Sequence, residues 1–120
     1  NHSITFNELK RILNKNGSLF GSTPFLYQVH GAPKDYYRFT EDFFKEKFEN
    51  TGFKKIKIEY LGFGPFVACF SILQPYTKYL LLINHTILLV CYIFDFILQI
   101  FIKNKFNKIY PIGVYFTAKK

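Results

Sequence analysis

The sequence predicts an α/β fold, and three patterns along its 120 residues support this prediction. Helical and extended patterns alternate through the first half of the chain, as in sheets built from helix–strand units. Residues 55–61 alternate between charged or polar and apolar side chains, which is typical of a strand with one face in solvent. Residues 109–118 carry bulky side chains on both faces, which indicates a strand covered on both sides.

The first predicted elements are a helix and a short strand. Apolar residues recur there at helical spacing: Phe6, Leu9, Ile12 and Leu13. Asn16-Gly17 would end this helix, because glycine is favoured just past a helix end. Residues 18–23 then form a candidate strand that Pro24 closes.

A second helix is predicted from Thr40 to Gly52. Thr40 is a good N-cap residue, and Glu41 and Asp42 lie in the first turn, where the helix dipole favours anions. Gly52 marks the end of the helix, and the alternating strand 55–61 follows.

Residues 66–104 are expected to form a hydrophobic helical insertion, interrupted at Pro75. As one helix, its run 79–102 would be about 36 Å long, enough to cross a bilayer. Asn84, Asp95 and Gln99 fall within about 60° of one another on that helix, and such a polar stripe suits a helix packed on a membrane surface or on protein. Three interpretations stay open: an interfacial or protein-packed helix, a membrane span, and a kinked pair of shorter helices.

Charge and cysteine content exclude several classes of protein. The chain has sixteen Lys and Arg against eight Asp and Glu, a net charge of +8, but no run of five basic residues, so no nucleic-acid partner is expected. Aromatic residues make up 21 % of the chain, which excludes disorder. Cys69 and Cys91 form no C-x-x-C pair, and the three histidines show no metal-ligand spacing, so no metal is predicted.

The segment between Pro24 and Thr40 is where chemistry is expected, because ligands bind beyond the carboxyl ends of strands in open α/β sheets. Residues 30–40 read H-G-A-P-K-D-Y-Y-R-F-T. This resembles the H-G-x-P-x-D-Y-Y-R-F-T loop of bacterial class I S-adenosylmethionine-dependent methyltransferases that are often found beside glycan biosynthesis genes. Residues 13–19 resemble that family's L-K-P-G-G-x-L turn, with Asn16 at a usual glycine, and residues 110–115 resemble its closing strand.

The resemblance implies a Rossmann-like seven-stranded sheet of order 3-2-1-4-5-7-6. This chain would supply strands five, six and seven, with the hydrophobic helical insertion between strands six and seven. S-adenosylmethionine is the implied cofactor, yet the sequence contains no G-x-G-x-G loop to hold it. The cofactor-binding residues are therefore expected upstream. Together with the absence of methionine, this predicts that residues 1–120 are the C-terminal, acceptor-side half of one domain, inactive alone.

The implied activity is methyl transfer to a small molecule or to a glycan or lipid-linked precursor. The predicted location is the cytoplasm, at the inner face of the membrane if 79–102 makes a peripheral membrane contact. His30 is the candidate general base, because imidazole titrates near neutrality, although it could instead lock the loop by a hydrogen bond. The candidate acceptor-binding residues are Tyr27, Asp35, Tyr36, Tyr37 and Arg38.

Two points about these residues stay open. Asp35 and Arg38 could pair with each other, or Arg38 could clamp a phosphate or carboxylate of the acceptor. The tyrosines could stack on a sugar or cofactor face, or pack in a core or lid. The alternative hypothesis for the whole chain is a non-enzymatic, small membrane-associated protein with a basic head and a hydrophobic anchor helix.

Overall fold

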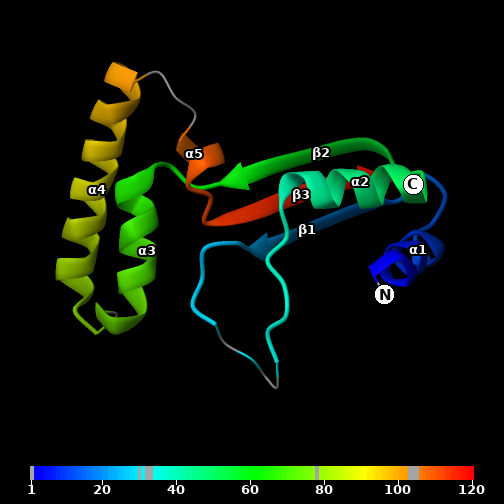
Figure 1. The fold of residues 1–120 in the computed structure, drawn as a ribbon, viewed down its shortest axis with the longest axis horizontal. Coiled ribbons are helices and arrows are strands. Elements are labelled where there is room, and N and C mark those ends of the chain that lie inside the picture. Colours follow the sequence, from blue (N-terminus) through cyan, green and yellow to red (C-terminus); the bar gives the residue numbers. More distant parts are fainter. Residues whose placement is uncertain (1, 30, 32–33, 78, 103–105) are drawn as a thin grey trace. The chain divides into compact units, whose positions relative to one another are not determined.

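The computed structural model describes residues 2–29, 31, 34–77, 79–102 and 106–120 (Figure 1). The chain divides into two compact units, one made of 1–23, 38–59 and 114–120, the other of 24–37 and 60–113. The elements, in chain order, are α1 (His2–Ile12), β1 (Ser18–Pro24), α2 (Glu41–Thr51), β2 (Lys54–Leu61), α3 (Pro65–Thr77), α4 (Leu81–Ile102), α5 (Phe106–Ile109) and β3 (Gly113–Lys119).

The three strands form one sheet of order β1-β3-β2. Lys120 N donates to Gly17 O at one end of the β1–β3 pair and Phe25 N donates to Ile112 O at the other, so these strands are antiparallel. The arrows in Figure 1 show that β3 also runs against β2, and β1 and β2 are therefore parallel. A mixed α/β fold is therefore confirmed, with neighbouring strands antiparallel, and the strand expected to be covered on both sides occupies the centre of the sheet.

The boundaries of α2 confirm the capping signals in the sequence. Thr40 Oγ1 accepts a hydrogen bond from Phe43 N at 3.3 Å, which satisfies a donor that the first turn cannot pair. At the other end Gly52 has φ 74°, in the left-handed region that favours glycine, and its N–H donates to Glu49 O.

Aromatic side chains form the core of the first unit. Phe48 is fully buried, and its ring centroid lies 5.1 Å from that of Phe6, 5.3 Å from Phe53 and 5.2 Å from Phe116. A Cβ on Gly21 would lie 2.4 Å from the Phe116 ring, so a glycine at this position lets the ring pack directly against the backbone of β1. The helices and the sheet of this unit are therefore joined through edge-on and tilted ring pairs.

In the second unit α3 and α4 pack as an antiparallel pair, since residues near the start of α3 contact Asp95 and its last residue contacts Asn84. Two expectations about this region are wrong. α3 continues through Pro75 to Thr77, because only two helical residues follow the proline and its missing N–H disturbs the last turn alone. The interpretation as a kinked pair fails too, because α4 is one continuous helix without Pro or Gly.

The strand expected over 109–118 begins later than the sequence pattern indicates. Ile109 closes the short helix α5, and Tyr110 N donates to Phe106 O at 2.8 Å in a helical turn. Pro111 has no N–H to contribute to a strand ladder, so β3 starts only at Gly113.

Candidate functional site

The candidate site lies where β1 and β2 end. Because these strands are parallel, the segments that follow them leave the sheet at the same edge. Ile112 ties the two segments together: its carbonyl accepts from Phe25 N at 2.8 Å and Leu26 N at 3.0 Å, and its N–H donates to Leu61 O at 2.7 Å. The first residues of the loop after β1 and the last residue of β2 are thus both hydrogen-bonded to Ile112.

Exposed tyrosines dominate the described part of the loop. Tyr36 is 70 % exposed and Tyr37 is 59 % exposed, and their ring centroids lie 6.0 Å apart at an angle of 37°. The Lys34 ammonium lies 6.0 Å from the centroid of the Tyr36 ring. The structure therefore brings two aromatic faces and one cation together at the surface, a combination that can stack on a sugar ring and attract an anion.

The other predicted site residues are placed less tightly. Tyr27 belongs to the same loop and is 46 % exposed. Asp35 and Arg38 are half-buried and fall in different compact units, and a pair between them stays a prediction. His30, the candidate base, lies outside the described residues, as do Ala32 and Pro33 of the loop motif.

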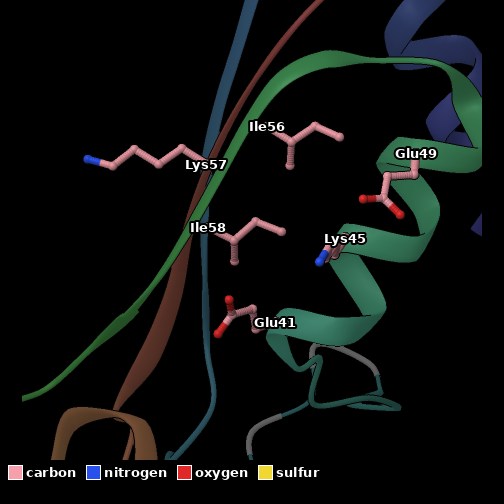
Figure 2. A pocket seen from close by; sticks show the side chains of 6 residues that line it. All are labelled: Glu41, Lys45, Glu49, Ile56, Lys57 and Ile58. Carbon is pink, nitrogen blue, oxygen red and sulfur yellow. The ribbon is translucent and has the colours of Figure 1, made fainter. Parts of the chain in front are cut away.

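A hollow of about 320 Å³ lies between α2 and β2, away from the loop (Figure 2). Ile56 and Ile58 point from the strand toward the helix, whereas Lys57 points away. On the helix, Glu41, Lys45 and Glu49 follow one another at intervals of four, which places alternating charges along one face. Those charges line a solvated face of α2, and the described residues that line this hollow include no Ser, Thr, Cys or His.

The polar stripe of the apolar run faces α3 and the segment before it. Asp95 is fully buried, and its carboxylate accepts from Phe66 N at 3.0 Å and Val67 N at 2.9 Å. Gln99 Nε2 donates to Phe63 O at 2.9 Å. On this one face α4 is therefore packed on protein. Lys78, Lys103 and Lys105, which flank the apolar run in the sequence, lie outside the described residues.

Gly64 is a residue of this arrangement that the sequence reasoning missed. A Cβ on Gly64 would lie 2.4 Å from the Asp95 carboxyl carbon, so only glycine lets the carboxylate reach the start of α3. The available signal was Gly64-Pro65 ahead of an apolar helix, combined with one acidic residue in the next apolar run.

Comparison of the chain with protein families, with curated proteins and with solved structures found no match in any of the three. No group of three or more His, Cys, Asp or Glu side chains that could hold a metal ion occurs among the described residues. The site is therefore defined by its position at the strand ends and by the tyrosine-rich loop.

Proposed function

We propose that this chain is the acceptor-side half of an S-adenosylmethionine-dependent methyltransferase. The strand order carries this proposal. In the order 3-2-1-4-5-7-6 the last three strands stand as 5-7-6, so the last strand along the chain lies between the two before it. The order β1-β3-β2 has the same arrangement, whereas a simple meander would place β2 in the centre.

The connection between the outer strands also supports the proposal. β1 and β2 are parallel and are joined through α2, which is the crossover that parallel strands require. The loop that carries the H-G-x-P-x-D-Y-Y-R-F-T pattern lies at the start of this crossover, beyond the carboxyl end of β1. That is where a ligand is expected in such a sheet.

The cofactor would have to be held by residues other than those described. Among the described segments, the glycine-containing turn from β2 into α3, Gly62–Pro65, is the nearest to a cofactor loop. Its helix start does not fit an anionic or ribose group, because Asp95 already accepts the N–H groups of Phe66 and Val67. S-adenosylmethionine would supply the methyl group, and this chain would supply the acceptor side.

On the acceptor side, the loop residues would have distinct roles. Tyr27, Tyr36 and Tyr37 form aromatic surface on which a sugar or small-molecule acceptor stacks. Arg38 binds a phosphate or carboxylate of the acceptor, with Asp35 orienting the loop. His30 takes the proton that an acceptor hydroxyl or amine loses as it gains the methyl group.

The acceptor class in the proposal is a small molecule or a glycan or lipid-linked precursor, and the location is the cytoplasmic face of a membrane. Among the described residues one helix, α4, is long and apolar enough to cross a bilayer, and 11 % of its apolar stretch is buried. This exposed surface also favours the alternative, a non-enzymatic membrane-associated protein with an anchor helix.

Methyl-labelled cofactor tests the proposal on protein made from the complete gene. We expect label transfer to one class among sugars, sugar phosphates and lipid-linked glycans. The Tyr37→Ala variant should raise KM for that acceptor about tenfold, equal to about 1.4 kcal/mol, and leave KM for the cofactor unchanged. The control is Asn50→Ala, which replaces an exposed residue of α2 and should change neither constant.

Two results would contradict the proposal. The first is protein that neither binds the cofactor nor transfers label to any acceptor class. The second is equal loss of activity in the Tyr37→Ala and Asn50→Ala variants, because the loop would then have no specific part in acceptor binding.

A further inference from the structure

On α4 the buried residues are polar, Asn84 and Asp95, and most of its large apolar side chains are exposed, whereas α3 buries the apolar Val67, Ala68 and Phe70. Asp95 and Gln99 turn from α4 toward α3 and the segment before it, and Asn84 Nδ2 donates to Thr77 O at 2.5 Å. Large apolar side chains of α4 instead lie at the surface, among them Leu82, 86 % exposed, and Phe101, 80 % exposed. Soluble helices bury their apolar face, so this distribution is the reverse of the usual one.

The inward hydrogen bonds satisfy backbone groups that helix geometry leaves unpaired. Phe66 N and Val67 N belong to the first turn of α3 and have no partner within their own helix. Asp95 supplies acceptors for both, and Gln99 supplies a donor for Phe63 O in the non-helical segment just before. Internal pairing of this kind is what a hydrocarbon environment demands, because no water is present to satisfy such groups.

The exposed apolar surface extends around most of α4. At 100° per residue, the exposed apolar residues from Tyr92 through Leu89 and Ile97 to Ile87 span about 220° of its circumference. His85 and Thr86 also lie in this arc, and their side chains bond to the backbone carbonyls of Leu81 and Leu82 one turn back. A protein partner covers one face of a helix, whereas lipid surrounds every side that the protein leaves open. A contiguous exposed apolar surface marks a site of interaction with protein or membrane.

The residues at the two ends of the pair fit the interface of a bilayer. Tyr76 and Tyr79, 77 % and 83 % exposed, flank the connection between the helices, and Lys78 lies between them in the sequence. At the other end the sequence continues with Lys103, Lys105 and Lys108, which suit anionic headgroups. Between Leu61 and Lys103 the sequence has only two Asp, Glu, Lys or Arg residues, Lys78 and Asp95.

We infer that the α3–α4 hairpin is embedded in the hydrocarbon of a lipid bilayer, entering and leaving it on one side. The hydrogen bond from Ile112 N to Leu61 O, 2.7 Å, joins the chain before the hairpin to the chain after it, so both ends lie on the same side. α4, with 22 residues, is about 33 Å long, whereas α3, with 13, is about 20 Å and too short to bring the chain across alone.

This inference goes beyond the proposed function, since it holds whether or not the protein transfers methyl groups. It also differs from a helix that lies flat on a membrane. A flat helix contacts acyl chains along one side, and an embedded hairpin contacts them on all its outward sides.

Tryptophan fluorescence separates these cases, because the chain contains no Trp and each introduced Trp reports alone. Leu89→Trp and Phe94→Trp replace exposed residues about 140° apart around α4. Each full-chain variant is mixed with phosphatidylcholine–phosphatidylglycerol vesicles with brominated acyl chains, and vesicles are recovered by flotation. The control is Phe20→Trp, which replaces a 66 % exposed residue of β1.

We expect bromine to quench both α4 reporters at least twofold and to leave the Phe20→Trp reporter unchanged. Quenching of only one α4 reporter would overturn the inference in favour of a flat helix. Protein that stays out of the vesicles, or quenching of neither reporter, would overturn it in favour of a protein partner or a second copy. Circular dichroism checks folding, and Leu82→Trp with Ile87→Trp forms a second pair at the same angular separation.

Discussion

Asp95 on α4 accepts a hydrogen bond from the backbone N–H of Val67 at 2.9 Å, and both residues are buried. The same carboxylate accepts from Phe66 N, so a side chain 28 residues further along the chain caps the start of α3. This contact explains why an acidic residue interrupts an otherwise apolar helix, and it fixes which face of α4 meets α3.

Replacing Asp95 by Asn should weaken the hairpin. The amide has one acceptor oxygen, so one of the two N–H groups loses its partner, at a cost of about 1–3 kcal/mol. Hydrogen exchange at Phe66 and Val67 should accelerate accordingly. The control is Glu49→Gln on the exposed face of α2, and unchanged exchange in the Asp95→Asn variant would show that the cap contributes nothing.

Gly64→Ala tests whether the Asp95 carboxylate needs the space that Gly64 leaves open. The added Cβ would lie 2.4 Å from the Asp95 carboxyl carbon, and the forced shift should lower the free energy of unfolding by about 1–3 kcal/mol. In the Asp95→Ala background the methyl group has room, so the cost of Gly64→Ala should fall. Additive effects in this double-mutant cycle, measured by denaturant unfolding, would contradict the clash.

Phe48→Ala should be the most damaging single change in the first unit. The ring is fully buried and contacts the rings of Phe6, Phe53 and Phe116, so its removal leaves a cavity that costs about 3–5 kcal/mol. Phe20→Ala is the matched control, because that ring is 66 % exposed. Equal losses in the two variants, measured by denaturant unfolding, would mean that Phe48 is not at the centre of the core.

Thr40→Ala removes the N-cap of α2 and should destabilise the protein by about 1 kcal/mol. Thr40→Ser retains the oxygen that accepts from Phe43 N and should keep most of the stability. Thermal unfolding of the two variants gives the comparison, and a Ser variant as unstable as the Ala variant would exclude the capping bond as the cause.

Local sequence signals were enough to predict the elements whose ends depend on neighbouring residues. Thr40 and Gly52 mark the ends of α2 because capping bonds join residues only three or four positions apart. The alternation in 55–61 predicted β2, because side chains of a strand point to opposite faces in turn. The loop between Pro24 and Thr40 was likewise placed after a strand.

The angular grouping of Asn84, Asp95 and Gln99 was also visible in the sequence, since it depends on helix period alone. What that stripe meets was decided only by tertiary structure. Its partners are Thr77, the first turn of α3 and Phe63, and the fit of Asp95 depends on Gly64, 31 positions away.

The sequence by itself therefore determined the α/β class, the capped helix, the half-exposed strand and the apolar run, because each rests on spacing along the chain. Tertiary structure decided that β3 lies between β1 and β2, that Ile112 joins the two segments at the strand ends, and that the apolar side of α4 faces outward. These features join residues far apart in the chain, and periodicity carries no information about which distant segment a face will meet.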